Sequence, residues 1–274
     1  MATDRVAPPA TGTERIAKAF AGAREDERAA LMPYMMGGFP DQGTAGAVAE
    51  AYVEAGADLI ELGVPFSDPL ADGPVIHAAA SSALARGATL GSVLETCATI
   101  PDRVPVVVMC YANMILAEGP REYAQRLASA GAAGTIVPDL PLEEAGGLHP
   151  ELRERGLALV PLVAPTTPPE RRRWICERAE GFVYVVSVSG VTGERAELPP
   201  ELGELVGAVR SEAAVPAAVG FGVGTPEQAA AVGRIADGVI VGSRLVRAAG
   251  DADDARSAAG AVAEFLREAR TMMG

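Results

Sequence analysis

The sequence predicts an α/β fold, a (β/α)8 TIM barrel with an extra N-terminal helix, from three observations. Eight short runs of β-branched or apolar residues recur along the 274-residue chain. Each run is followed by a turn rich in Gly, Pro or Asp, and then by an Ala-rich stretch with helical spacing. Strands and helices that alternate in this way form βα units around a parallel sheet, and the chain length suits one closed barrel.

The segments between the predicted strands read as amphipathic helices. TAGAVAEAYVEAG (44–56) and REYAQRLASAG (121–131) place apolar residues three and four positions apart and end at glycine, as such helices do. A first helix is expected near residues 13–30 and a last one near 252–272. The predicted strands cover residues 31–37, 58–64, 104–111, 134–138, 157–163, 182–189, 215–222 and 238–243.

A single domain is expected over residues 13–274, after a disordered N-terminal tail at 1–12. The tail is rich in Pro and Ala, and no linker interrupts the rest of the chain. An open doubly wound sheet is the rival architecture. Its first strand-helix turn normally carries a GxGxxG fingerprint, which YMMGGFPDQG (34–43) does not provide.

Composition excludes several classes of function. The formal net charge of −13 disfavours binding to nucleic acid or to an anionic membrane. The three cysteines, Cys97, Cys110 and Cys176, form no CxxC pair, so neither a disulfide framework nor a zinc site is suggested. The N-terminus has no apolar core of a signal peptide, and no segment of about 18 apolar residues occurs that could span a membrane. A cytoplasmic location is expected.

Glu61 is the first candidate catalytic residue. It interrupts the apolar run DLIELGV (58–64), and functional groups of such barrels lie at the carboxyl ends of the strands. Burial disfavours a charged carboxylate, which raises its pKa toward the range of a general acid or base near neutral pH. The alternative is a structural carboxylate paired with an arginine or with backbone amides, but arginines are sparse in the strand segments.

Two more acids follow on the next loop, in FSDPLADGP (66–74). Asp68 is expected to cap a turn, as Asp near Pro or Gly often does. For Asp72 the residues alone leave a capping role and a role in the site equally open.

Glycine-rich turns near the C-terminus predict a phosphate site. Gly220, Gly222 and Gly224 follow the seventh predicted strand, while Gly242 and Ser243 follow the eighth. Backbone N–H groups of these loops bind phosphate in many barrels, although glycines can also serve tight turns alone.

Three further residues stand near the predicted carboxyl end of the barrel. Gly193 lies in a long loop after the sixth strand, which reads either as a lid over a substrate or as a mobile surface loop. Tyr111 and Tyr184 suit the wall of an aromatic pocket or an ordinary core.

The scarcity of lysine and histidine excludes three mechanisms. Lys18 is the only lysine and lies in no predicted strand, so a Schiff base is not expected. His77, in a predicted helix, and His149, before one, are the only histidines, which disfavours a metal site and a Ser-His-Asp triad. Carboxylate acid-base chemistry on a phosphorylated substrate remains.

These motifs resemble a known family. DLIELGVPFSDPLADGPVI, IVPDLPLEE, VSVSGVTG, VGFGV and DGVIVGSRLV, in this order and spacing, closely resemble the tryptophan synthase alpha chain over about residues 14–270. The resemblance implies a lyase of aromatic amino-acid biosynthesis that cleaves indole-3-glycerol phosphate to indole and glyceraldehyde 3-phosphate by a retro-aldol reaction.

The resemblance also implies roles for individual residues and a partner. Glu61 would be the acid-base residue, and Asp72 would accept the indole N–H. A pyridoxal-phosphate beta chain is the expected partner in an alpha2beta2 heterotetramer, whereas this chain itself is expected to hold no cofactor and no metal. The implied binding positions are Tyr111, Tyr184, Thr192, Phe221 and Ile240 for the indole and glycerol chain, Gly193, Gly222, Gly242 and Ser243 for phosphate, and Pro65, Phe66, Asp68 and Asn113 for the partner.

Two other functions remain open from the sequence. One is a free-standing lyase that releases indole without a beta chain. The other is a regulatory subunit that binds phosphorylated ligands without cleaving them, which the presence of both Glu61 and Asp72 disfavours.

Overall fold

The computed structural model describes residues 10–186, 200–220 and 222–274. Its strands are all paired in parallel and form one sheet in the order β5-β4-β3-β2-β1-β9-β8-β7-β6. They are β1 (Ala30–Met36), β2 (Ile60–Gly63), β3 (Val106–Met109), β4 (Gly134–Ile136), β5 (Ala158–Val160), β6 (Leu162–Val163), β7 (Val183–Val186), β8 (Ala217–Gly220) and β9 (Gly238–Val241).

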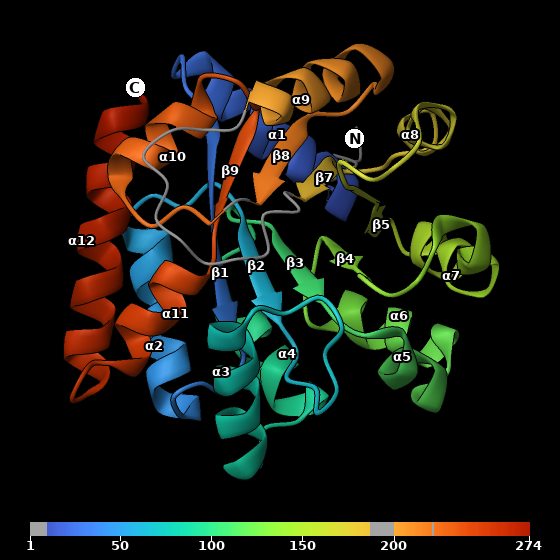
Figure 1. Cartoon of the computed structure of the whole chain (residues 1–274). Helices are drawn as coiled ribbons and strands as arrows, with labels where there is room; N and C mark the ends of the chain where they lie inside the picture. Colours follow the sequence, from blue (N-terminus) through green and yellow to red (C-terminus); the bar gives the residue numbers. More distant parts are fainter. Residues whose placement is uncertain (1–9, 187–199, 221) are drawn as a thin grey trace, which may run out of the picture.

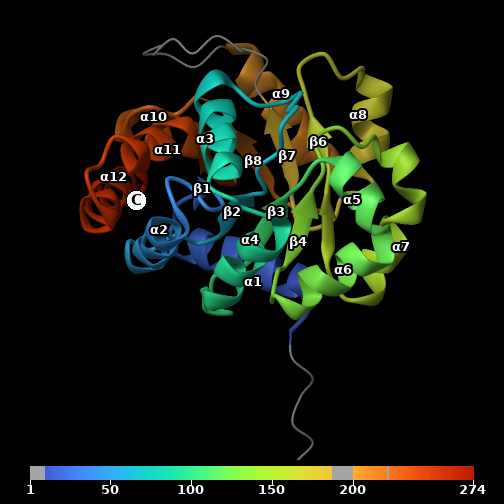
Figure 2. The same ribbon diagram turned by 90° about the horizontal axis from the view of Figure 1, so that it is seen from below.

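The sheet closes on itself at Pro161. The two strands at the ends of the order, β5 and β6, follow one another in the chain with only this residue between them. Proline has no N–H to give to the sheet, so the predicted strand at 157–163 becomes two short strands, one paired with β4 and the other with β7. Figure 2 shows the strands inside a ring of helices. The predicted (β/α)8 barrel is confirmed.

Helices follow nearly every strand and cover the outside of the barrel (Figure 1). The helix α12 lies along α2, α10 and α11. The helices are α1 (Gly12–Glu25), α2 (Gln42–Glu54), α3 (Pro74–Ala85), α4 (Leu90–Thr99), α5 (Ala112–Glu118), α6 (Pro120–Ser129), the 3-10 helix η1 (Leu142–Gly147), α7 (His149–Glu154), α8 (Pro169–Cys176), α9 (Pro200–Glu212), α10 (Pro226–Gly233), α11 (Ser243–Gly250) and α12 (Ala255–Met273).

The extra N-terminal helix α1 closes the amino end of the barrel. Thr11 caps it in a capping box with Glu14. The Arg15 side chain donates to the carbonyl oxygens of Gly131 and Ala132, at 2.7 and 2.8 Å, just before β4. The apolar face of α1, which includes Phe20, packs into the inner core of the barrel. With this end closed, the carboxyl ends of the strands remain for the site.

Some boundaries differ from the predicted ones. The first helix ends at Glu25 rather than near residue 30, because the chain reverses at Glu27, whose φ is 58°. It begins at Gly12, inside the expected tail of residues 1–12. His149 is the first residue of α7 and does not precede it. No helix in the described ranges is long and apolar enough to cross a membrane.

Candidate active site

Glu61 lies in β2 and points into the barrel. Its neighbours Ile60 and Leu62 belong to the outer core between sheet and helices, so the alternation of side chains along a strand turns Glu61 inward. The side chain is only 2% exposed, and its Oε2 atom has no hydrogen-bond partner in the described parts of the chain. Burial, helped by the nearby negative charge of Asp72, raises the pKa of Glu61 to about 8. Glu61 therefore holds its proton at neutral pH.

A structural ion pair does not account for Glu61. Among the described residues no arginine or lysine pairs with it, and no cationic group lowers its pKa. The alternative of an arginine partner is thus not supported. A buried, protonated and unpaired carboxyl group is costly to keep, which is typical of a functional site.

Asp72 lies on the loop that leads from β2 into α3, close enough to Glu61 for their charges to interact. It is half-buried, and burial raises its pKa, while a hydrogen bond from the Tyr111 hydroxyl and the charge of His77 lower it. Asp72 caps no helix, because Gly73 occupies the N-cap of α3. A helix-cap role for Asp72 is therefore wrong, and the charge of Asp72 is close enough to act on Glu61.

Tyr111 ties the loop to the third strand. Its hydroxyl accepts a hydrogen bond of 3.2 Å from the backbone N–H of Ala71 and contacts Asp72. Its ring stacks on that of Phe66, with centroids 5.1 Å apart and an interplanar angle of 26°. Tyr111 thus holds Asp72 through two contacts, one with the backbone of the preceding residue and one with the Asp72 side chain.

Tyr184 and Ile240 complete the inner wall from the other side of the barrel. Ile240, on β9, belongs to the inner core, and Tyr184, on β7, packs against that core. Burial and the charges of Glu61 and Asp72 raise the pKa of the Tyr184 hydroxyl well above its ordinary value. Its ring lies over Gly220, where a Cβ would come within 2.6 Å of Tyr184 Cζ.

Tyr34, on β1, also faces the two carboxyl groups but is not singled out by the sequence analysis. It is 4% exposed, its Cα pairs with that of Glu61, and the charges of Asp72 and Glu61 help to raise its pKa. A tyrosine near the carboxyl end of a predicted barrel strand is the signal that would have found it.

Two of the predicted phosphate positions lie where β9 meets α11. Gly242 is the N-cap of α11 and Ser243 its first residue, both half-buried. The first N–H groups of a helix have no partner inside it and favour an anion. Gly222 is exposed, with no atom within 4 Å of an added Cβ. The N–H of Gly224, in contrast, is already bonded to Gln228 Oε1 at 2.7 Å.

Three predicted site residues lie outside the described residues. They are Thr192 and Gly193, in the expected lid, and Phe221.

Comparison with known proteins agrees with this geometry. Residues 20–273 match the family described as tryptophan synthase alpha chain. The chain belongs to that family. It is 46% identical over 257 residues to the tryptophan synthase alpha chain of Gloeobacter violaceus, covering 93% of each chain. It is 47% identical over 260 residues to that of Halorhodospira halophila, again covering 93% of each.

A solved structure of tryptophan synthase from Mycobacterium tuberculosis has the same fold. Its matching chain superposes with a TM-score of 0.88 at 38% identity, covering 97% of this chain and 99% of that one. As a member of the tryptophan synthase alpha chain family, the protein is a lyase of tryptophan biosynthesis, and its reaction is the cleavage of indole-3-glycerol phosphate. The expected family, fold and activity are confirmed.

Of the predicted partner-contact residues, Pro65, Phe66 and Asp68 lie between β2 and α3, and Asn113 lies in α5. Pro65 is buried and Phe66 half-buried, whereas Asp68 and Asn113 are exposed. The Asp68 carboxylate accepts a hydrogen bond from the hydroxyl of Ser67, within its own loop, in keeping with the expected turn role.

Among the described residues, no cysteine takes part in the site, and His77 acts on it only through its charge near Asp72. His77 lies in α3 and His149 in α7. All three cysteines are free and buried. Within the described part of the chain, no three His, Cys, Asp or Glu side chains are grouped so that they could hold a metal ion.

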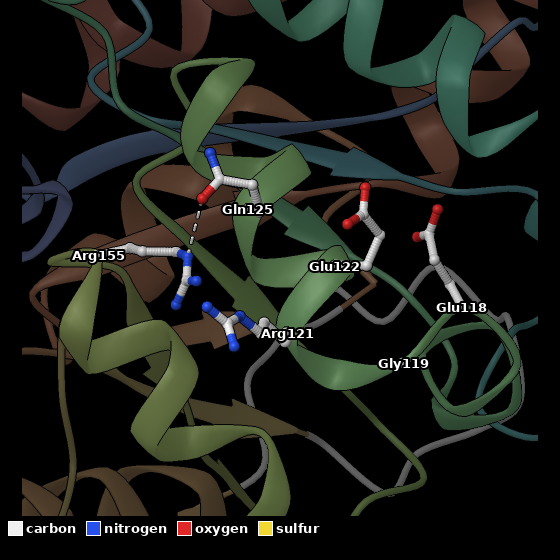
Figure 3. A pocket seen from close by; sticks show the side chains of 6 residues that line it. All are labelled: Glu118, Gly119, Arg121, Glu122, Gln125 and Arg155. Carbon is white, nitrogen blue, oxygen red and sulfur yellow. Dashed lines mark hydrogen bonds between the residues drawn. The ribbon is translucent and has the colours of Figure 1, made fainter.

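A surface hollow of about 440 Å³ lies away from the two carboxyl groups, at α6 and the end of α7 (Figure 3). Two of its charged residues are paired within the chain. Glu118 pairs with Arg126, and Arg155 pairs with Glu151 at 2.9 Å. The hollow is not part of the candidate active site, and its lining residues are Glu118, Gly119, Arg121, Glu122, Gln125 and Arg155.

Proposed function

We propose that Glu61 and Asp72 carry out the cleavage of indole-3-glycerol phosphate to indole and glyceraldehyde 3-phosphate in this chain. The single observation that carries the proposal is the buried Glu61, whose Oε2 atom has no partner among the described residues and whose pKa is raised to about 8. A carboxylic acid that keeps its proton at neutral pH can donate it to carbon. No external reagent is required, because the reaction only moves protons and breaks one carbon-carbon bond.

The first step is protonation of the indole ring. Protonated Glu61 gives its proton to C3 of the indole, and the ring becomes cationic. Asp72 accepts a hydrogen bond from the ring N–H, where the positive charge develops. The hydrogen bond from Tyr111 helps to keep Asp72 ionised for this role.

The second step breaks the bond between indole C3 and the glycerol carbon that carries the hydroxyl. The electron pair of that bond returns to the ring and neutralises it. The hydroxyl loses its proton to the Glu61 carboxylate and becomes the aldehyde oxygen. Glu61 regains the proton it gave, so the enzyme returns to its starting state.

We assign the rest of the substrate to the remaining predicted residues. Tyr111, Tyr184 and Ile240 contact the indole and glycerol chain, together with Thr192 and Phe221. The phosphate binds Gly242 and Ser243 at the start of α11, with Gly193 and Gly222. This assignment is supported by the unpaired N–H groups expected at a helix start.

The protein works with a beta chain that uses pyridoxal phosphate, in an alpha2beta2 heterotetramer. Pro65, Phe66, Asp68 and Asn113 provide contacts to that chain. Leu70, on the loop between β2 and α3, is 84% exposed, and Leu116, on α5, is 68% exposed. A partner chain would cover both apolar side chains. A cytoplasmic location is supported by the three free, buried cysteines.

The test is an assay of indole and glyceraldehyde 3-phosphate release from indole-3-glycerol phosphate by the purified chain, with and without a beta chain. We expect slow release alone and a large increase with the partner. Equally fast release in both cases would favour a free-standing lyase. No release in either case would overturn the assigned chemistry and favour a regulatory subunit.

A further inference from the structure

Tyr34 and Glu61 lie opposite each other on adjacent strands. Their Cα atoms are register partners in the parallel pairing of β1 with β2. Side chains of paired residues point to the same face of a sheet, and Glu61 points into the barrel. The Tyr34 side chain is therefore directed to the same interior.

Gly63 fixes how far the Tyr34 hydroxyl reaches. A Cβ on Gly63 would overlap the Tyr34 hydroxyl and would lie 2.7 Å from its Cζ atom. The hydroxyl thus lies directly over Gly63, on the face of β2 that also carries Glu61. Glu61 lies two positions before Gly63, about 6.6 Å along the strand, and its charge is close enough to act on the Tyr34 hydroxyl.

The Tyr34 hydroxyl has no strong partner where it lies. Within the described residues, its one hydrogen bond is a long contact of 4.0 Å to Met36 Sδ. The surrounding side chains are apolar and come from α3 and α11, among them Ala80 and Val246. A buried hydroxyl in such surroundings costs free energy unless it is hydrogen-bonded.

Glu61 presents the complementary deficiency. Its Oε2 atom is buried without a donor in the described residues. While Glu61 is protonated, its carboxyl group is neutral. Once the proton is lost, the Glu61 carboxylate carries a full negative charge in an apolar interior. The nearest strand thus offers an unused donor, and β2 offers an unused acceptor.

We infer that the Tyr34 hydroxyl donates a hydrogen bond to the Glu61 carboxylate once Glu61 has given up its proton, so that Tyr34 is a positioning residue for Glu61. Its importance for turnover rests on the proposed function of Glu61 as the proton donor. The hydrogen bond itself does not depend on the identity of the substrate.

The other groups that face Glu61 do not supply this donor. Asp72, on the loop after β2, is negative and raises the pKa of Glu61. Tyr111 is engaged by Ala71 and Asp72, and His77 acts on Asp72. The charge of Glu61 also acts on Tyr184, on β7, but the Tyr184 hydroxyl lies over Gly220 on the neighbouring strand β8.

The test is a titration of the Glu61 carboxyl carbon by NMR in protein labelled with 13C on glutamate side chains, with Glu61→Gln to assign the resonance. A hydrogen bond from Tyr34 favours the ionised form, so Tyr34→Phe should raise the pKa of Glu61 by about one pH unit. The matched control is Tyr123→Phe, which removes an equally buried hydroxyl bonded to Thr135 at 2.8 Å outside the barrel interior. It should leave the titration unchanged.

An unchanged or lowered pKa of Glu61 in Tyr34→Phe would overturn the inference. A shift in Tyr184→Phe instead would also overturn it, because the donor would then be Tyr184. A second measurement avoids any change in packing that a Tyr34 substitution could cause, because it observes Tyr34 in the wild-type protein. The Cζ resonance of Tyr34 in the wild-type protein should shift as Glu61 titrates and should lose that response in Glu61→Gln. A Tyr34 resonance that ignores Glu61 contradicts the inference.

These readouts do not require turnover. A protein that fails to cleave indole-3-glycerol phosphate but shows the raised pKa in Tyr34→Phe would refute the proposed function and support the hydrogen bond. A protein that cleaves the substrate but whose Glu61 pKa is unchanged in Tyr34→Phe would support the proposed function and refute the hydrogen bond.

Discussion

The backbone N–H of Ala71 donates a hydrogen bond of 3.2 Å to the hydroxyl of Tyr111, and this bond fixes the loop one residue before Asp72. The same hydroxyl lowers the pKa of Asp72 against the effect of burial. One side chain at the end of the third strand therefore controls both the position and the charge of the residue proposed to accept the indole N–H.

Replacing Tyr111 should reduce cleavage at acidic pH and so narrow the pH range in which the enzyme is active. Asp72 must be ionised and Glu61 protonated, so kcat/KM should follow a bell-shaped pH profile with its alkaline limb near the Glu61 pKa of about 8. In Tyr111→Phe the pKa of Asp72 rises, and the acidic limb should move to higher pH. The alkaline limb should stay in place, as should both limbs in the control Tyr123→Phe. A profile of Tyr111→Phe that matches the wild type would contradict the role given to this hydroxyl.

Glu61→Gln should stabilise the fold at alkaline pH. The ordinary pKa of Glu61 is 4.5 and its folded-state pKa about 8, so between these values the folded protein holds a proton that the unfolded chain loses. The free energy of unfolding therefore falls as pH rises from about 4.5 to about 8. Glutamine does not titrate, so the variant does not lose this stability. Between pH 4 and pH 8 the free energy of unfolding of wild type should therefore fall by on the order of 2 to 5 kcal/mol more than that of Glu61→Gln.

Urea unfolding at both pH values measures this difference. Glu50→Gln, at an exposed position on α2, is the control and should unfold with the same pH dependence as wild type. If Glu61→Gln also follows the wild-type dependence, Glu61 is not protonated in the folded protein.

Gly63→Ala should damage both stability and turnover. The added Cβ would overlap the Tyr34 ring, and overpacking of this kind costs about 1–3 kcal/mol. Displacement of Tyr34 beside Glu61 should lower kcat by roughly a hundredfold. Gly46→Ala, in α2 with no atom within 4 Å of the new Cβ, is the control and should leave both quantities close to wild type or slightly raise stability. Full activity in Gly63→Ala would show that Tyr34 need not lie where it does.

Asp58 should be important for stability but not for chemistry. Its carboxylate accepts a hydrogen bond of 2.7 Å from Leu31 N and two from Arg28, at 2.5 and 2.9 Å, just before β2. Arg28 is only 5% exposed, and without Asp58 its guanidinium keeps only the exposed Asp26 as an ion-pair partner. Asp58→Ala should therefore cost about 3 kcal/mol.

The matched control is Asp102→Ala, whose partner Arg15 lies 3.4 Å away while Asp102 itself is 90% exposed. It should cost less than about 1 kcal/mol. Thermal unfolding measures both variants, and cleavage assayed well below the melting temperature should be unchanged in each. Equal costs for the two variants would contradict the assigned burial of the Arg28 pair.

The barrel and the inward position of Glu61 could be predicted because both leave local signals in the sequence. Glu61 interrupts an apolar strand, and Gly242 with Ser243 follows another strand directly, so a period of two and a turn motif suffice to place them. Pro161 was visible in the fifth predicted strand, but the split into β5 and β6 depends on which neighbour each half pairs with. That pairing is a property of the closed sheet.

Tyr34 and the environment of Asp72 could not be predicted from single positions. The importance of Tyr34 depends on register, since only the pairing of β1 with β2 brings it opposite Glu61. Asp72 left a cap and a site role equally open, because Asp before Gly suits both. Its contact with Tyr111 joins residues 39 positions apart in the chain, and no local pattern reports such a contact. The predicted roles of Thr192, Gly193 and Phe221 remain predictions.

The most direct test of the central claim compares wild-type protein with Glu61→Gln in single-turnover cleavage of indole-3-glycerol phosphate, alongside substrate binding measured by calorimetry. Loss of the proton donor should reduce the cleavage rate by a factor on the order of 10² to 10⁴ while the dissociation constant stays close to wild type. Cleavage at the wild-type rate by Glu61→Gln would contradict the assignment of Glu61 as the acid that protonates indole.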